Sequence, residues 1–410
     1  MPSSRGQTIA QSKQIKITLL LASSMSVMAA AIIAPSLPGM GQHFTGHSDV
    51  LIKLILTMPA LLIALSGAPL GYLADRFGRK RLLLISLLLY GAAGFSGYWA
   101  ESLGALLAGR AVLGVAVAGI ISMSTTLIGD YFEPGERARF LGFQGSFMVL
   151  GGLLFLNLGG VLAEWNWRGP FIVYLASIAL LPMAARVLYE PKRELTERVS
   201  ASRREAEIDR PTTGLVYILA MLGMMLLYVV PTQLPFFLAE KANIGSAAVG
   251  FAISTTTITS AVVSFFYGRI QAFSSFAGIY AAAFFLIAAG YLVVGLTHSY
   301  AIVTLGVALS GFGLGLFMPN GAVWLMSITS ERARGRIIGG YTSMLFLGQF
   351  LSPLVVAPLA VQSPSLGQVF LATAAIAVAL AVVLFALSRT LLRVDSPSPS
   401  NTCVRAPDAK

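Results

Sequence analysis

The stretch that decides the fold is GYLADRFGRKR, residues 71–81. It is a short charged turn between two apolar runs, 50–72 and 82–100, each long enough to cross the roughly 30 Å of hydrocarbon in a bilayer. Gly71 and Gly78 permit a tight turn, because glycine adopts backbone conformations that other residues avoid. The four cations of the turn favour the cytoplasmic side of a membrane. The stretch therefore predicts two membrane-spanning helices joined by a cytoplasmic turn.

The rest of the chain repeats this alternation. Hydrophobic residues make up 56% of the 410 residues, charged residues make up 11%, and the mean hydropathy is +0.79. Ordinary soluble proteins carry roughly a quarter charged residues. The first apolar run is too long for a cleavable signal peptide, so we expect it to stay in the membrane. The sequence predicts an all-α membrane protein with twelve transmembrane helices, over residues 16–39, 50–72, 82–100, 103–128, 138–163, 168–189, 213–238, 246–268, 275–296, 299–328, 336–360 and 366–392.

The distribution of the 28 lysines and arginines predicts the orientation. Twenty-four of them fall in segments on the side of the N-terminus, and only Lys53, Arg168 and Lys241 fall in segments on the other side. The positive-inside rule then places both termini in the cytoplasm and the chain in the plasma (inner) membrane. The net charge of +11 is thus a topology signal and an attraction to anionic inner-leaflet lipids. We expect no nucleic-acid partner.

A long charged stretch after the sixth span divides the chain into six spans plus six. The two halves share a short sequence motif: Glu-Arg-Ala-Arg occurs at 136–139 and again at 331–334, at the same place in each half. Such internal duplication is typical of transporters built from two pseudo-symmetric bundles. The expected units are a cytoplasmic tail over 1–15, a six-helix bundle over 16–189, a cytoplasmic linker over 190–212, a second six-helix bundle over 213–393 and a disordered tail over 394–410.

The turn at 71–81 closely resembles the G-x-x-x-D-R-x-G-R-K signature of the major facilitator superfamily. The number of spans, the linker position and the half-repeat extend this resemblance over essentially the whole chain. The resemblance implies a monomeric secondary transporter that works by alternating access. In that family the turn latches the two halves together on the cytoplasmic face, with its carboxylate near the start of the eleventh span, here Gly335-Arg336. The gating residues that this implies, which would stabilise the outward-open state, are Gly71, Asp75, Arg76, Gly78 and Arg79.

Further motifs are similar to those of the drug:proton antiporter branch. They are Pro35-Ser-Leu-Pro38-Gly39, Arg110 followed by Gly114, Gly129-Asp130-Tyr131-Phe132 and Trp167-Arg168. The similarity implies proton-coupled efflux of a drug or metabolite. The fifth span departs from the branch, because Phe155-Leu156 occupy the place of its usual Gly-Pro pair before Gly159-Gly160. The alternative stays open: uptake or facilitated transport of a small organic anion or zwitterion bound at Arg110.

Arg110 is the one formal charge that these boundaries place well inside a span, which is costly unless the charge is paired or hydrated. Either backbone carbonyls hold it in a structural role, or it lies in a central cavity and binds substrate or couples protons. No carboxylate falls in the middle of a span, so the proton-carrying residue is undefined. An arginine without a buried acid leaves the cavity positive, and we therefore expect an anionic or zwitterionic substrate.

Neutral polar side chains complete the candidate substrate and coupling site. Each of them is also typical of hydrogen bonds between helices. In the fifth span Gly145, Gly152 and Gly159 recur every seven residues and form a stripe without side chains, where a partner helix can approach closely. The candidate residues beside Arg110 are Gln144, Asn157, Gln233, Asn320 and Gln349.

Other function classes lack their residues in this sequence. There is one cysteine and there are three histidines, which the expected spans place outside the membrane, so we expect no disulfide and no metal site. The sequence has no Gly-x-x-x-x-Gly-Lys-Ser/Thr phosphate loop, which excludes an ATPase of that type. A membrane enzyme needs acid–base or nucleophilic groups that converge at one depth. We expect neither catalysis nor a cofactor.

Overall fold

The computed structural model describes residues 13–191, 209–242, 244–362 and 365–394. Within these residues the secondary structure is helical and contains no strand. Twelve segments are long and apolar enough to cross a membrane. The prediction of an all-α membrane protein with twelve spans is thereby confirmed.

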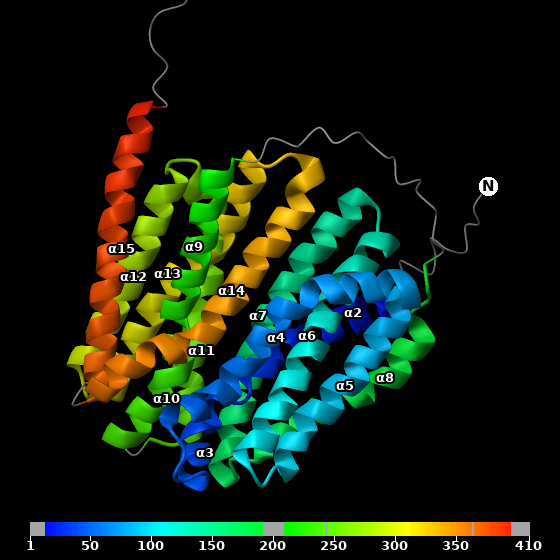
Figure 1. The fold of residues 1–410 in the computed structure, drawn as a ribbon, viewed down its shortest axis with the longest axis horizontal. Coiled ribbons are helices and arrows are strands. Elements are labelled where there is room, and N and C mark those ends of the chain that lie inside the picture. Colours follow the sequence, from blue (N-terminus) through cyan, green and yellow to red (C-terminus); the bar gives the residue numbers. More distant parts are fainter. Residues whose placement is uncertain (1–12, 192–208, 243, 363–364, 395–410) are drawn as a thin grey trace, which may run out of the picture.

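The first six spans comprise nine helical elements, seven α-helices and two short 3-10 helices. Two spans are broken: the first consists of α2, η1 and α3, and the sixth of η2 and α8 (Figure 1). The elements are α2 (Lys13–Ala31), η1 (Ala34–Ser36), α3 (Leu37–His43), α4 (Asp49–Phe77), α5 (Arg79–Trp99), α6 (Leu103–Tyr131), α7 (Pro134–Trp165), η2 (Gly169–Leu175) and α8 (Ala176–Val187).

The second six spans contain one break, in the seventh span, between α9 and α10. The first and seventh spans hold the same place in the two halves, so the broken helix is itself repeated. The elements are α9 (Arg210–Leu227), α10 (Val229–Ala242), α11 (Ser246–Gln271), α12 (Phe276–Leu296), α13 (Tyr300–Ile328), α14 (Glu331–Gln362) and α15 (Leu366–Val394).

Neighbouring helices supply the hydrogen bonds that the break in the seventh span removes. The carbonyl of Leu226 accepts a bond of 2.6 Å from the Tyr291 hydroxyl, and the carbonyl of Met225 accepts one of 2.7 Å from the Ser352 hydroxyl. Lipid offers no donor to a free carbonyl, so a break inside a span is tolerated only where protein groups satisfy it. The break therefore fixes α9 and α10 against α12 and α14.

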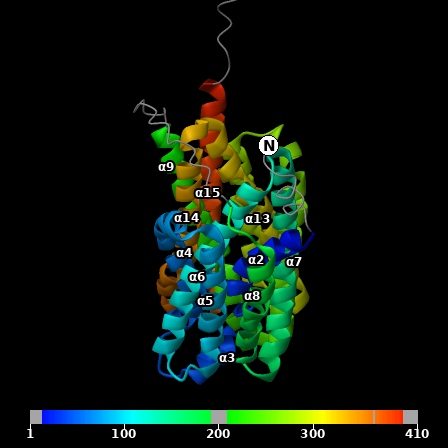
Figure 2. The same cartoon turned by 90° about the vertical axis from the view of Figure 1, so that its right-hand side faces the viewer.

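The helices form two bundles that lie side by side (Figure 1). In the first bundle α6 packs against α4 and α5, and in the second α12 packs against α13 and α15. The bundles meet mainly through two pairs of helices, α4 with α14 and α7 with α11. The side view in Figure 2 shows the length over which the helices run roughly parallel. This is the two-bundle arrangement that the half-repeat predicts.

The two ends of the molecule differ in how closely the bundles approach. We call the end that carries Lys13 and Val394 the terminal face, and the other end the opposite face. Toward the opposite face, the Glu164 carboxylate on α7 accepts a bond of 3.2 Å from the Ala247 N–H on α11. Helix α10 also contacts α3 and η1 there. The bundles are thus joined at the opposite face.

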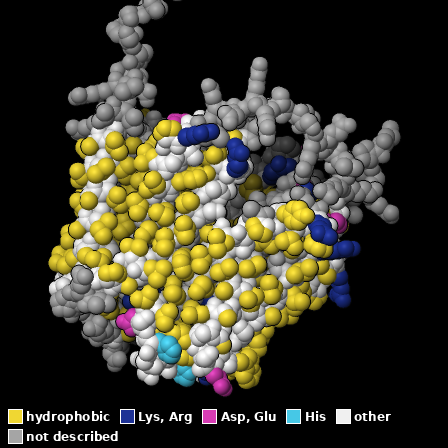
Figure 3. Space-filling model, viewed as in Figure 1, with side chains coloured by type: hydrophobic (Ala, Val, Ile, Leu, Met, Phe, Trp, Pro, Cys, Tyr) yellow, Lys and Arg dark blue, Asp and Glu magenta, His cyan; other side chains and the backbone are white. Residues whose placement is uncertain are grey.

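Toward the terminal face the bundles are apart. A Cβ atom placed on Gly67 or Gly71 of α4, or on Gly335 or Gly339 of α14, would meet no atom within 4 Å. Figure 3 shows the surface hollowed between the bundles at this end, with lysines and arginines around the hollow. The structure is therefore open at the terminal face and closed at the opposite face.

Candidate functional site

Arg110 on α6 is buried inside the first bundle, with 1% of its surface exposed. Its Nε donates to the Ile55 carbonyl at 2.8 Å, one Nη donates to the Tyr174 hydroxyl at 2.7 Å, and the other donates to the Ala29 carbonyl. All three nitrogens are bonded, and the acceptors come from α4, η2 and α2 of the same bundle. In this conformation the guanidinium is not open to a ligand.

The local sequence explains why these two carbonyls need a donor. The Ile55 carbonyl would normally accept from the N–H four residues later, but that residue is Pro59, which has none. The Ala29 carbonyl lies in the last turn before α2 breaks, and the N–H of Ile33 bonds to Ala30 instead. Arg110 satisfies both orphaned carbonyls. This geometry favours the structural interpretation of Arg110 over a role as a ligand for substrate.

Three of the predicted amide side chains also bond within their own bundle. Gln144 donates to the Ser23 hydroxyl at 2.6 Å and ties α7 to α2. Asn157 donates to the Leu153 carbonyl of its own helix at 2.8 Å. Asn320 is fully buried in the second bundle, where it accepts from the Tyr267 hydroxyl at 3.0 Å and donates to the Phe276 carbonyl at 2.9 Å. Gln349 on α14 is half-buried.

Gln233 behaves differently, because its partner is on the other bundle. Its Oε1 accepts a hydrogen bond of 2.7 Å from the Lys53 ammonium, which joins α10 to α4. Lys53 is 3% exposed and Gln233 is 1% exposed. The Lys53 Nζ also lies 5.1 Å from the centre of the Phe236 ring. A buried cation therefore bridges the two halves near the opposite face.

Lys53 stands close to the start of the expected span 50–72, and its placement in an outer segment is wrong because the structure buries it. Helix α4 begins at Asp49, so Lys53 lies in its second turn and within a segment that can span the membrane. Arg110 is consequently not the only charge inside a span. The hydropathy pattern could not show that Lys53 is buried, because α10 of the other half covers it and the packing of α10 is not a local property of the sequence.

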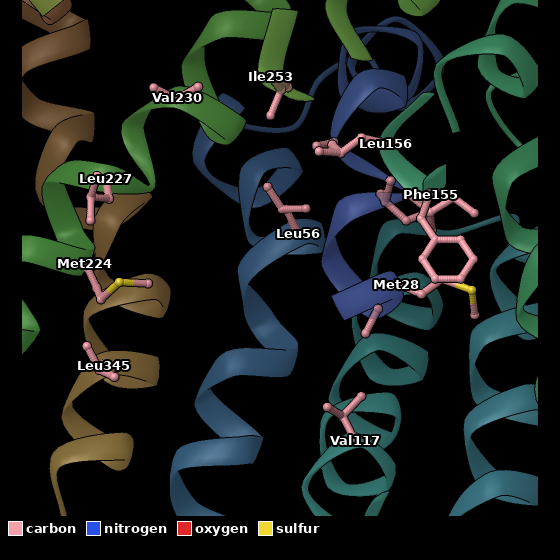
Figure 4. Close-up of a cluster of buried hydrophobic side chains, with 14 of the residues drawn as sticks. Met28, Leu56, Val117, Phe155, Leu156, Met224, Leu227, Val230, Ile253 and Leu345 are labelled. Carbon is pink, nitrogen blue, oxygen red and sulfur yellow. The ribbon is translucent and has the colours of Figure 1, made fainter. Parts of the chain in front are cut away.

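An apolar layer lies one turn further into the protein from this bridge. Leu56 follows Lys53 by three residues and Val230 precedes Gln233 by three, so both lie on the side toward the terminal face. Figure 4 shows Leu56 of α4, Leu156 of α7 and Ile253 of α11 in the region between the bundles, with Val230 of α10 apart from them. All four are buried. A polar bridge and an apolar layer together close the passage at this end.

The predicted gating turn makes its hydrogen bonds within the first bundle. Gly78 has a φ of +90°, and the next two N–H groups, of Arg79 and Lys80, donate to the Glu190 carboxylate at 2.6 and 3.0 Å. A carboxylate is favoured there because the N-terminus of α5 carries partial positive charge. The Arg79 guanidinium pairs with Asp130 at 2.5 Å.

Sequence reasoning missed Glu190 as a partner of this turn, because it assigned Glu190 to the cytoplasmic linker 190–212, directly after the first bundle. Arg76 and Gly71 are exposed. The side chain of Asp75 lies outside the described part of the chain. In the described part of the turn, the hydrogen bonds thus hold α5 to α6 and to the end of the sixth span.

A cavity of about 420 Å³ opens at the terminal face between the first span and the start of α7. It contains two cations, one carboxylate and three phenylalanine rings. The Lys16 Nζ lies 5.5 Å from the centre of the Phe132 ring, and the Arg139 guanidinium lies 5.9 Å from that of Phe143. The lining residues are Lys16, Leu20, Phe132, Glu136, Arg139, Phe140 and Phe143.

The glycine stripe of α7 faces the first span over part of its length. A Cβ on Gly159 would collide with the backbone of Ile32, and one on Gly152 would lie 3.1 Å from the side chain of Val27. Gly145, nearer the terminal face, has no atom within 4 Å of that position. Close approach of α7 to the first span therefore depends on two of the three glycines.

Twelve spans in two bundles, closed at one end and open at the other, define a membrane transporter. The family model described as Major Facilitator Superfamily matches residues 19–237 and 213–407. The chain belongs to the major facilitator superfamily. It is a multi-pass membrane protein, and the family implies a small-molecule substrate.

Individual relatives include exporters. The chain is 27% identical over 350 residues to a bacillibactin exporter of Bacillus subtilis (strain 168), covering 80% of this chain and 85% of that protein. It is 31% identical over 181 residues to a puromycin resistance protein of Streptomyces alboniger, covering 43% of this chain and 35% of that one.

Solved structures share the fold at low identity. A bacterial homologue of the human lysosomal transporter Spinster, in an inward-facing and unoccupied conformation, has a TM-score of 0.79 at 18% identity, over 97% of this chain and all of that one. The human organic anion transporter MFSD10 has a TM-score of 0.66 at 18% identity, over 91% and 99%. These likenesses establish the fold alone.

Proposed function

We propose that the chain exports a small organic compound across the plasma membrane by alternating access, driven by protons that flow inward. The observation that carries the direction is the similarity to the bacillibactin exporter, which covers 80% of this chain and 85% of that protein. The resemblance of Arg110, Gly114 and the Gly129–Phe132 motif to the drug:proton antiporter branch supports the coupling to protons.

The proposed orientation has both termini in the cytoplasm, as the distribution of lysine and arginine indicates. The terminal face is then the cytoplasmic face, and the open hollow faces the cytoplasm. An exporter loads its substrate in this state. The cavity lined by Lys16, Arg139 and three phenylalanine rings would be the first part of the protein that a substrate meets.

The composition of that cavity supports a substrate with acidic and aromatic groups. Two cations stand against one carboxylate, Glu136, and the rings of Phe132 and Phe143 offer flat apolar surfaces. The sequence analysis attributed the positive charge of the substrate cavity to Arg110. Because Arg110 is hydrogen-bonded inside the first bundle, the attraction for an anion in this proposal comes from Lys16 and Arg139.

We further propose that the turn at 71–81 acts as a latch when the cytoplasmic side closes. Gly67 and Gly71 on α4, and Gly335 and Gly339 on α14, leave room for the two helices to approach there. Asp75, Arg76 and Arg79 would then lie near the start of α14. Gly78 permits the turn, because its φ of +90° is one that residues with a side chain rarely adopt.

Flux into sealed inside-out vesicles tests the proposal. Carboxyfluorescein, an aromatic anion, and ethidium, an aromatic cation, are compared with an acidic lumen and with no pH gradient. We expect carboxyfluorescein to accumulate only with the acidic lumen, and a protonophore to abolish the accumulation. Equal accumulation with and without the pH gradient would contradict proton coupling. Preference for ethidium would contradict an anionic substrate.

A further inference from the structure

We infer that Lys53, together with Gln233 and Thr57, forms a binding site for an anionic group at the outer end of the passage, which the structure holds closed. The inference rests on the proposed function for its orientation, in which the opposite face is the outer one. It assigns the positive charge of the outer passage to Lys53, in place of Arg110.

The first observation is an excess of unsatisfied donors. The Nε2 of Gln233 and the Oγ1 of Thr57 are buried and have no hydrogen-bond partner among the residues that the structure describes, and Thr57 is fully buried one turn after Lys53 on α4. Lys53 has one hydrogen bond, to the neutral amide oxygen of Gln233. Burying a polar group without a partner is costly. An ammonium, an amide NH₂ and a hydroxyl are together the groups that would bind a carboxylate or another oxyanion.

The second observation is that the partner of Lys53 belongs to the other bundle. Alternating access moves the bundles relative to each other, so opening the outer end separates α4 from α10. Lys53 then loses Gln233 and faces the outer solution. An anion that reaches Lys53 in the open state replaces the lost hydrogen bond and delays re-closure.

The charged neighbour of this site is Asp49. Its carboxylate is exposed and lies one turn before Lys53 on the same helix, where it interacts electrostatically with the ammonium. In the open state this carboxylate competes with a bound anion for Lys53. Removing its charge should therefore strengthen anion binding, whereas removing the charge of Lys53 should weaken it.

The apolar layer determines which side has access. Lys53 is buried, and Leu56 and Val230, one turn toward the terminal face on α4 and α10, are buried as well, so an anion has no open route to Lys53 from the cytoplasm in this state. Binding at Lys53 therefore favours the outward-open state. Because that state closes the cytoplasmic side, anion binding should make the start of α14 less accessible.

The test uses the full chain in lipid nanodiscs, with benzenesulfonate as the anionic probe and trimethylphenylammonium as a cation of similar shape. Calorimetric titration measures binding of each probe. We expect benzenesulfonate to bind and Lys53→Gln to weaken it about tenfold or more, as for the loss of a hydrogen-bonded charge. Lys53→Arg should retain binding within about threefold, since the charge persists. Asp49→Asn should tighten it.

A second measurement reports the conformation. With Cys403→Ser as background, Gly335→Cys places a thiol on the open stretch of α14, and its labelling by a water-soluble maleimide is timed. Benzenesulfonate should slow the labelling severalfold in this background and should have no effect once Lys53→Gln is added. Unchanged labelling would overturn the inference. Binding that is lost in Lys16→Gln and kept in Lys53→Gln would also overturn it and would place the anion at the cytoplasmic cavity.

These measurements do not require transport, so they separate the two proposals. If vesicles show proton-driven export while the probe binds independently of Lys53, the anion site is wrong and the proposed function stands. If binding and labelling depend on Lys53 while no export occurs, the proposed function is wrong and the site stands.

Discussion

Arg110 and Lys53 are both buried cations of the first bundle, yet they differ in where their partners come from. The partners of Arg110 are in α2, α4 and η2, which belong to its own bundle. The partner of Lys53 is Gln233 on α10, in the other bundle. When the bundles move as bodies, the bonds of Arg110 persist and the bond of Lys53 breaks. Burial alone thus does not distinguish a structural cation from one that takes part in switching.

The largest expected effect is that of Arg110→Ala, which tests the structural role assigned to Arg110 in the comparison of the two cations. It leaves the carbonyls of Ile55 and Ala29 and the Tyr174 hydroxyl with fewer partners inside the bundle. We expect a loss of roughly 3–5 kcal/mol in the stability of the fold, from the unmatched acceptors and the cavity left by the side chain, measured as a lower temperature of unfolding of the purified protein. A variant of unchanged stability that lost only transport would make Arg110 a substrate residue.

The next effect is that of Lys53→Met, which removes the charge but keeps the volume. The substitution removes the cost of burying a charge but leaves the buried amide oxygen of Gln233 without its donor, so we expect the unfolding temperature to fall by less than in Arg110→Ala. The outer closure loses its hydrogen bond between the bundles, and the proposed export should slow about tenfold, equivalent to about 1.4 kcal/mol. A stability loss as large as that of Arg110→Ala would remove the distinction between the two cations.

Pro59→Ala sharpens the structural assignment of Arg110. The new N–H at position 59 can bond to the Ile55 carbonyl, which reduces the need for a donor from Arg110. In a double-mutant cycle with Arg110→Met, Pro59→Ala should recover about 1 kcal/mol, the net value of one hydrogen bond. Strictly additive effects of the two substitutions would show that the carbonyl is not what Arg110 serves.

The smallest expected effect is that of Glu190→Gln, at a second set of bonds inside the first bundle. The neutral amide loses the attraction between a carboxylate and the N-terminus of α5, worth roughly 0.3–1 kcal/mol. Like Arg110, Glu190 moves with its partners, so the effect should be on stability alone. We expect a slightly lower unfolding temperature at low salt and no difference from the original protein at high salt, because salt screens the interaction. A change in Gly335→Cys labelling in this variant would instead connect Glu190 with switching.

The fold was predictable because its signals are local. Each apolar run is long enough to span a bilayer whatever surrounds it, and the twelve spans in the structure follow the twelve runs. The short turn with Gly78 also appears where the sequence places it, since a positive φ is a property of one residue and its neighbours. The partners of the polar residues inside the spans are long-range, and the sequence left them open.

Some of those partners were within reach of sequence reasoning. Pro59 has no N–H to donate to the carbonyl of Ile55, which accepts from Arg110 instead. Pro319 likewise offers no donor to the carbonyl of Gly315, which accepts from the Ser264 hydroxyl at 2.9 Å. A proline inside a span predicts that some donor must come from a neighbouring helix. It does not predict which helix supplies it.

The sequence by itself determined the twelve spans, their division into two halves and the charged turns, because apolar length and charge distribution act on each segment separately. Only the tertiary structure decided that Arg110 is satisfied inside one bundle, and that Lys53 is buried and bridges two. The physical reason is that a buried charge is stabilised or left unsatisfied by atoms far away in the chain, and their positions follow from the packing of whole helices.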